Sequence, residues 1–313
     1  MEFQIISDGA CDLTLELREK YNIQVVPFYI SFDGETYQKE IDEIGIREVY
    51  ERMVSDPKTY PKTSLPSVQN YVDAFLPHVE AGRGVICFTI TTSLSGSYNA
   101  AMNAKEIIEE DYPDAKITIV NSLAATVSQQ IHVIEAAKMQ QAGYSYDEVV
   151  QTVEGQMKDS GRIFFTVGDL EYLQHGGRIG KLAGMAGTML KLKPMITLKD
   201  GEIESSGVAR SRKKSMVKVL ELLKNHFEES GENPEDYYYY VGFGYDEEEG
   251  KVFQQMIDDQ LAEMGVTVPS VLVQIGVTIC VHTGPYALGV GIMKKYPACV
   301  SGTAGRTVQM CTA

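Results

Sequence analysis

The chain of 313 residues lacks the cysteine spacings that bind metals or form redox pairs. Its five cysteines are scattered, which favours free thiols in a reducing compartment over a disulfide framework. No apolar run reaches the roughly 18 residues that a membrane-spanning helix needs. The opening stretch MEFQIISDG enters a strand pattern at once and has no features of a secretion signal. These absences predict a cytoplasmic protein without a bound metal.

Basic residues are also scarce, with 28 lysines and arginines against 43 aspartates and glutamates and a formal net charge of -15. Such a surface repels phosphate backbones, so nucleic acid is excluded as the main partner. Anionic membranes are repelled in the same way, which leaves room only for peripheral or transient membrane contact. Any anionic ligand must therefore be bound by local groups that act against the overall charge.

Two familiar catalytic motifs are absent as well. The stretch GGRIGK, residues 176–181, does not have the GxxxxGK[ST] spacing of a nucleotide-binding loop. Leu94-Ser95-Gly96 lacks the preceding glycine of the GxSxG nucleophile elbow, and no obvious triad acid accompanies Ser95. The sequence therefore disfavours a kinase and a serine hydrolase, although an esterase that uses Ser95 and His282 remains the alternative enzyme hypothesis.

Strand and helix patterns alternate through the first half of the chain. Residues 84–90 (GVICFTI) are short, apolar and rich in β-branched side chains, as expected for a buried parallel strand. We predict an α/β fold in which residues 1–160 form a mostly parallel, doubly wound sheet. Residues 161–296 are expected to form a second α/β domain with a mixed or antiparallel sheet. Residues 297–313 are small and polar, which predicts a flexible tail.

Hydroxyl groups are concentrated in the loop Thr91 to Tyr98, between the strand at 84–90 and a helical pattern. Open α/β sheets bind ligands at the carboxyl ends of their strands, where helix N-terminal amides also attract anions. The simpler alternative is a structural turn with serine or threonine as the helix cap. Polar residues at Asp8, Thr63 and Ser122 occupy comparable places after strands or before helices, which favours a ligand-binding edge.

Other local patterns give more specific expectations. The three prolines between Asp56 and Pro66 predict a loop without regular structure. Asp12 is expected to cap a helix that runs to Tyr21, and Val277 to Val281 is expected to form a strand that ends at His282. The other four histidines have polar neighbours and are expected at the surface: His78, His132, His175 and His226. His282 is either part of a binding site or an ordinary histidine in a strand-end turn.

Five motifs together resemble the DegV family, bacterial fatty-acid-binding proteins that serve fatty acid kinase. They occur in the family's order and cover the chain to about residue 295: KTSLPS (62–67), TTSLSGSY (91–98), LEYLQHGGRIGK (170–181), LKPMITLKDGEIESSGVARSRKKS (192–215) and HTGPYALG (282–289). The resemblance implies two α/β domains with a long-chain fatty acid buried at their junction. It further implies a carboxylate site made of Thr63, Ser95 and His282. Gly96, Arg178 and Arg210 match positions near the head group or on the surface that faces the kinase.

The resemblance thus implies a carrier rather than an enzyme. The carrier presents its fatty acid to a separate kinase, and the acyl phosphate goes on to phospholipid synthesis. It needs no cofactor, and its chain-binding tunnel could be lined by residues 184–190 and by the strands around Phe28 and Ile275, each of which could equally be plain core. A binder of another small carboxylate is the second alternative. Three positions depart from the family pattern, namely Gly9, Leu65 and Tyr286, and they affect the expected shape of the site.

Overall fold

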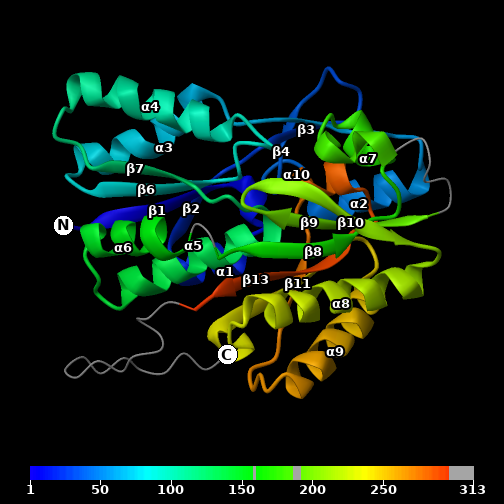
Figure 1. The fold of residues 1–313 in the computed structure, drawn as a ribbon. Coiled ribbons are helices and arrows are strands. Elements are labelled where there is room, and N and C mark those ends of the chain that lie inside the picture. Colours follow the sequence, from blue (N-terminus) through cyan, green and yellow to red (C-terminus); the bar gives the residue numbers. More distant parts are fainter. Residues whose placement is uncertain (158–159, 186–191, 296–313) are drawn as a thin grey trace.

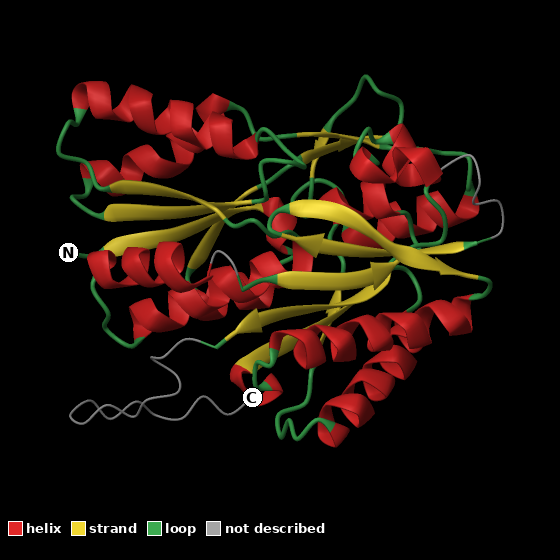
Figure 2. Ribbon diagram, viewed as in Figure 1, coloured by secondary structure: helices red, strands yellow, loops and turns green. Residues whose placement is uncertain are grey.

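The computed structural model of the chain describes residues 1–157, 160–185 and 192–295 (Figure 1). Two large sheets with helices packed against them form most of the molecule, and a small third sheet lies beside them (Figure 2). Within the described ranges, no helix is long and apolar enough to cross a bilayer. The domain boundary at residue 160 stays a prediction, and the expected tail at 297–313 lies outside the described residues.

The first sheet is parallel throughout, with the strand order β2-β1-β6-β7. Its strands are Phe3–Asp8 (β1), Ile23–Val26 (β2), Gly84–Thr89 (β6) and Ile117–Asn121 (β7). One face is covered by Val68–Glu80 (α3) and Ser97–Asp111 (α4), and the other by Leu15–Tyr21 (α1), Thr126–Gln141 (α5) and Tyr146–Thr152 (α6) (Figure 1). The doubly wound parallel sheet that the sequence predicts is therefore confirmed.

The second sheet is mixed, with the order β10-β9-β8-β13-β11-β12. Its strands are Arg162–Thr166 (β8), Lys193–Lys199 (β9), Glu202–Ala209 (β10), Tyr237–Phe243 (β11), Val271–Gln274 (β12) and Leu288–Lys294 (β13). All neighbours are antiparallel except β11 and β12. The helices Arg212–Ser230 (α8) and Glu247–Glu263 (α9) cover one face, as the core around Val219 and Phe253 shows (Figure 1). The mixed sheet expected for the second half is thus confirmed.

Helix α5 lies between the two large sheets and packs against β1, β11 and β13. Nearly all of its side chains are buried, as expected for a helix covered on every side. The surface position expected for His132 is wrong, because this residue lies on α5 and is only 1% exposed. Neither ring nitrogen of His132 has a hydrogen-bond partner, and burial lowers the pKa of its imidazole to about 3. The polar neighbours of His132 in the sequence therefore gave no indication of its burial.

The small sheet contains Tyr29–Ser31 (β3), Gln38–Lys39 (β4) and Lys62–Ser64 (β5) in the order β4-β3-β5. The prediction that residues 56–66 have no regular structure was wrong, because β5 forms there and pairs with β3. Proline is tolerated around this strand because β5 is three residues long, lies at an edge, and contains no proline itself. Strand β5 carries Thr63 and so fixes one of the expected site residues.

Three short helices, Ile46–Ser55 (α2), Glu171–His175 (α7) and Val277–Thr283 (α10), pack beside the small sheet. The strand expected at 277–281 is wrong, since these residues form α10 and are buried. A five-residue apolar run cannot distinguish a buried strand from a buried helix by its periodicity. Helix α10 places His282 one turn after Thr278 on the same side, about 6 Å along the axis, whereas a strand would separate the two residues by roughly 13 Å.

Short helical turns complete the described chain: Gly9–Cys11 (η1), Val153–Met157 (η2), Gly180–Met185 (η3) and Pro234–Asp236 (η4).

Asp12 was expected to cap α1, and this is wrong. The cap is Thr14, whose hydroxyl accepts a hydrogen bond from Leu17 N. Asp12 instead ends η1 in the left-handed conformation, with φ 55°, and is buried. Its carboxyl group is therefore available for contacts deeper in the molecule.

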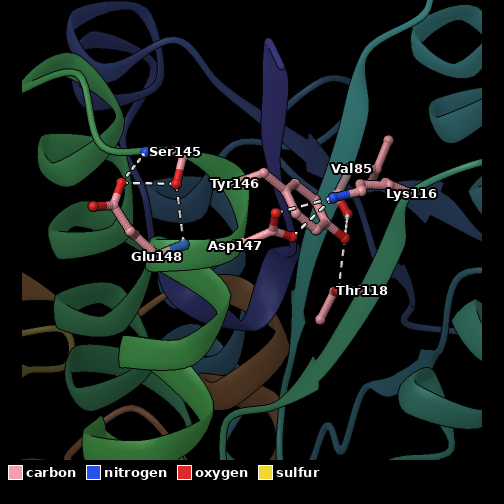
Figure 3. Close-up of polar contacts among 7 residues, drawn as sticks. All are labelled: Val85, Lys116, Thr118, Ser145, Tyr146, Asp147 and Glu148. Carbon is pink, nitrogen blue, oxygen red and sulfur yellow. Dashed lines mark hydrogen bonds and ion pairs between the residues drawn. The ribbon is translucent and has the colours of Figure 1, made fainter.

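The α6 contacts in Figure 3 show how a helix is held against the parallel sheet. Ser145 and Glu148 form a reciprocal cap, with distances of 2.7 Å from Ser145 N to Glu148 Oε2 and 3.3 Å from Glu148 N to Ser145 Oγ. The hydroxyl of Tyr146 lies 2.6 Å from Thr118 Oγ1 on β7. A Cβ at Gly84 would lie 2.8 Å from the Tyr146 ring, so this position on β6 requires glycine.

Candidate ligand-binding site

An apolar cavity of about 250 Å³ lies where the carboxyl end of the parallel sheet meets the mixed sheet. Segments distant in the sequence contribute to its wall, including β5, the loop after β6, the start of α5, α10 and five strands of the mixed sheet. Most of its lining is aliphatic or aromatic: Phe28, Leu65, Ile90, Leu94, Val127, Ile163, Phe165, Leu173, Leu198, Ile203, Ile275, Ile279 and Leu288. The two strand regions expected to line a tunnel, around Phe28 and Ile275, both reach this cavity. The third tunnel candidate, residues 184–190, lies mostly outside the described residues.

The hydroxyl of Thr63 and the imidazole of His282 meet at the edge of the cavity. Thr63 Oγ1 lies 2.9 Å from His282 Nε2, and both residues line the cavity. The other ring nitrogen of His282, Nδ1, is buried and has no hydrogen-bond partner. The sequence prediction that these two residues belong together in space is consistent with this contact.

Gly176 at the end of α7 is required for this arrangement. A Cβ at Gly176 would lie 2.1 Å from Nδ1 of His282, so any larger residue would displace the imidazole. The carbonyl oxygen of Gly176 also accepts a hydrogen bond of 2.7 Å from Nη1 of Arg178. The GGRI stretch therefore supports His282 and directs Arg178.

The Thr91 to Tyr98 loop brings Ser95 to the same cavity. Ser95 is 9% exposed and lines the cavity, and its Oγ accepts a hydrogen bond of 3.2 Å from Ser97 N. Arg178 fixes this loop through a bond of 3.0 Å from its Nε to the carbonyl oxygen of Leu94. Arg178 also lines the cavity itself. Thr63, Ser95, His282 and Arg178 thus form one polar group on a wall that is mainly apolar.

The imidazole of His282 is neutral at physiological pH. Burial lowers the pKa of His282 to about 4, and the positive charge of Arg178 lowers it further in the same direction. A neutral imidazole can donate one hydrogen bond and accept another, and hydroxyl groups can do both. Because Arg178 supplies the one permanent positive charge among these four residues, the group can bind a carboxylate without a second buried cation.

The remaining predicted site residues lie further away. Gly96 is the first flanking residue of α4, and a Cβ there would lie 3.4 Å from Leu65 Cδ2. Arg210 is exposed after β10 and is not part of the cavity lining. Tyr286, one of the three departures from the family pattern, is 45% exposed and lies near Gly168, where an added Cβ would be 3.5 Å from its side chain. Leu65 does line the cavity, so that departure from the family pattern affects its shape.

Asp8 is an organising residue whose role the sequence pattern did not reveal. Its Oδ2 accepts hydrogen bonds of 2.9 Å from Ile90 N and 2.7 Å from Ser97 Oγ, and its Oδ1 accepts one of 2.8 Å from Gln129 Nε2. The carboxyl group therefore ties β1 to the hydroxyl-rich loop and to α5. Burial raises the pKa of Asp8 to about 6, while the hydrogen bond from Ser97 lowers it. Its place after a strand was visible in the sequence, but its partners were not.

Comparisons with known proteins show which proteins this chain is similar to. A family model described as "Uncharacterised protein, DegV family" matches residues 2–295. A stearic-acid-binding protein from Eubacterium ventriosum is 45% identical, with a TM-score of 0.88 over 95% of this chain and 99% of that one. A DegV family protein from Thermus thermophilus that binds fatty acid is 27% identical, with a TM-score of 0.81 over 94% of this chain and 100% of that one. A DegV domain-containing protein of Clostridium perfringens is 31% identical over 92% of this chain and 96% of its own length.

Proposed function

The chain belongs to the DegV family, and we propose that it is a carrier that binds one long-chain fatty acid in the apolar cavity. The observation that carries this proposal is the polar group on the wall of that mainly apolar cavity, formed by Thr63, Ser95, His282 and Arg178. The related proteins from Eubacterium ventriosum and Thermus thermophilus, which bind fatty acids, support the same ligand class.

The acyl chain supplies the larger part of the binding free energy. Each buried methylene is worth about 0.8 kcal/mol, so a chain of about 14 methylenes corresponds to roughly 11 kcal/mol of transfer free energy. The carboxylate gains less, because its hydrogen bonds in the site replace hydrogen bonds to water. The polar group therefore fixes the orientation of the fatty acid, and the cavity wall determines the affinity.

We further propose that the bound carboxylate is presented to a separate, cytoplasmic fatty acid kinase, and that the acyl phosphate serves phospholipid synthesis. Transient contact with a membrane would then deliver or collect the ligand. Arg210, Lys213 and Lys214 are exposed and have no ion pair within the described part of the chain, which suits them for contact with an acidic partner. Arg212, in contrast, is engaged by Glu249 at 2.6 Å. The expected basic contact surface therefore consists of these three exposed side chains.

A titration of delipidated protein with a dansyl-labelled undecanoic acid tests the carrier proposal. We expect saturable binding and displacement of the probe by hexadecanoic acid. Methyl hexadecanoate has the same chain without the negative charge and should displace the probe much less well. Displacement by short carboxylates such as butanoate, or no saturable binding at all, would contradict a fatty-acid carrier.

The kinase proposal has its own test, acyl phosphate formation from ATP in the presence of a purified fatty acid kinase. Arg210→Glu should lower the rate of phosphorylation and leave the affinity for hexadecanoic acid unchanged. Lys224→Glu is the matched control, because Lys224 is an exposed cation of α8 that pairs with Glu228 at 3.6 Å. Equal rates in wild type and Arg210→Glu would contradict docking at this surface.

A further inference from the structure

A second cavity, of about 860 Å³, lies behind the first one. The two cavities share no lining residue. At the start of α10, some residues line the first cavity and their neighbours in the sequence line the second. Ile275 and Thr278 line the first cavity, whereas Gly276 and Val277 line the second. The two cavities are therefore separated by a wall that is about one residue thick at this turn.

Glu40 supports this wall from the side of the second cavity. It is 1% exposed, and its Oε2 accepts a hydrogen bond of 2.7 Å from Thr278 Oγ1 and one of 3.3 Å from Thr278 N. Its Oε1 accepts a bond of 2.9 Å from Phe28 N. Both Thr278 and Phe28 line the apolar cavity, while Glu40 lines the second one. The Thr278 hydroxyl therefore donates its hydrogen bond towards the second cavity and away from the apolar one.

Asp12 forms a parallel contact on the same wall. Its Oδ2 accepts a hydrogen bond from the hydroxyl of Thr126, which lines the apolar cavity, and Asp12 itself lines the second cavity. Thr126 has φ 45°, a conformation that β-branched residues rarely adopt. A Cβ at Gly276 would lie 2.3 Å from Asp12 Oδ1, so α10 begins directly against this carboxyl group. The second threonine hydroxyl is thus also bound on the side away from the apolar cavity.

We propose that Glu40 and Asp12 are positioning residues that make the apolar cavity select unsubstituted acyl chains over hydroxylated ones. Because the hydroxyl groups of Thr278 and Thr126 donate their protons to these carboxylates on the far side of the wall, neither threonine donates a hydrogen bond to a hydroxyl group on the ligand. A hydroxyl buried without a partner is strongly disfavoured. This inference rests on the proposed function, because it concerns which fatty acids the carrier accepts.

The affected part of the ligand lies near its carboxyl end. Thr278 and His282 are four residues apart on α10, which corresponds to about 6 Å along the helix axis. A hydroxyl several carbons from the carboxyl group, such as one on carbon 6, therefore lies near the wall, whereas one at the methyl end does not. The pair 6-hydroxyhexadecanoic and 16-hydroxyhexadecanoic acid distinguishes the two regions.

Gly9 offers a way to restore the wall after Glu40 is removed. A Cβ at position 9 would lie 1.5 Å from Glu40 Oε1 and 3.4 Å from Phe28 N. A side chain at position 9 and the Glu40 carboxylate therefore exclude each other. In the absence of Glu40, a serine at position 9 would place its side chain in the space that this carboxylate now occupies.

The experiment measures displacement of the dansyl probe by hexadecanoic acid and by its 6-hydroxy derivative. The ratio of the two dissociation constants should be on the order of ten or more in wild type, because the buried hydroxyl has no partner. Glu40→Ala should bring this ratio close to one, since the Thr278 hydroxyl and water from the second cavity become available. Gly9→Ser with Glu40→Ala should raise the ratio again, and Asp42→Ala, an exposed acidic residue nearby, should leave it unchanged.

Thr278→Val keeps the shape of the wall without a hydroxyl and should retain the wild-type ratio, even if Glu40→Ala fails to fold. Discrimination against 16-hydroxyhexadecanoic acid should be the same in all variants. If Glu40→Ala weakens the binding of both acids equally, the ratio of their dissociation constants stays unchanged. Glu40 would then have a merely structural role, and the inference would be overturned. Loss of discrimination in Thr278→Val would overturn it as well. If wild type binds hexadecanoic acid, these outcomes leave the carrier function intact; if wild type binds no fatty acid, both proposals fail.

Discussion

Thr63 Oγ1 lies 2.9 Å from His282 Nε2, a contact that joins β5 to α10 across 219 residues of sequence. The two residues belong to different parts of the chain, and both line the apolar cavity. Because the His282 imidazole is neutral, this pair presents hydrogen-bonding groups without adding a charge. The contact therefore closes one side of the site and leaves Arg178 to balance the charge of a bound carboxylate.

Removal of the imidazole should weaken ligand binding. We expect His282→Ala to reduce the affinity for hexadecanoic acid by about tenfold to a hundredfold, since a hydrogen bond to a charged group is worth roughly 1.5–3 kcal/mol. His78→Ala, on α3 and outside the cavity lining, is the control and should bind as wild type does. Probe displacement measures both, and equal affinities for the two variants would exclude His282 from the site.

The buried histidine should also affect stability in acid. Its pKa in the folded protein is about 4, below the ordinary value near 6.5. The unfolded chain therefore takes up a proton first, so this residue's contribution to stability is fully present above pH 6.5 and is lost as the pH falls towards 4. The difference in unfolding free energy between His282→Gln and wild type, from urea titrations at pH 7 and pH 4.5, should shift in favour of the variant at the lower pH. A difference that does not change with pH would contradict this assignment.

Asp12 should have the opposite pH dependence. Burial raises its pKa to about 7, although the Thr126 hydrogen bond lowers it in part. Its contribution to stability is therefore fully present below pH 3.8 and is lost as the pH rises through 7. Relative to wild type, Asp12→Asn should become progressively more stable between pH 4 and pH 8. Thermal unfolding across this range measures the trend, and the exposed control Asp42→Asn should show no such trend.

Ser95 should act as a hydrogen-bonding residue and not as a nucleophile. His282 Nε2 is engaged by Thr63, and Ser95 Oγ accepts a bond from Ser97 N. We therefore expect no hydrolysis of p-nitrophenyl esters beyond the rate without protein. Ser95→Ala should weaken fatty-acid binding by several-fold, consistent with a lost hydrogen bond of about 1 kcal/mol. Ester turnover that Ser95→Ala abolishes would support the esterase alternative instead.

Residues at strand ends were predictable from the sequence because their positions follow from short-range patterns. The strands before Asp8 and before the loop of Ser95 could be recognised, and parallel strands bring such ends to one edge. The DegV resemblance added Thr63 and His282, which no local pattern could have joined across 219 residues. A strand was predicted where α10 forms because the run of residues 277–281 is short and mainly apolar. Such a run is too short for its hydrophobic periodicity to distinguish a helix from a strand.

Buried polar residues were the least predictable feature. Glu40 looks like a surface residue in the sequence, and only the three-dimensional contacts show that its carboxylate occupies the space that Gly9 leaves open. His132 was misjudged for the same reason, since the burial of α5 results from both large sheets together. Such positions depend on contacts between distant segments, which the pattern of a single helix or strand does not contain.

Native mass spectrometry of the purified protein tests the carrier proposal most directly. The spectrum of the purified protein should contain a population whose mass exceeds that of the chain by one fatty acid of about 14 to 20 carbons. This added mass should disappear on delipidation, return when hexadecanoic acid is supplied, and be reduced in His282→Ala. A wild-type protein that never carries such a mass, even after it is reloaded with fatty acid, would contradict the account.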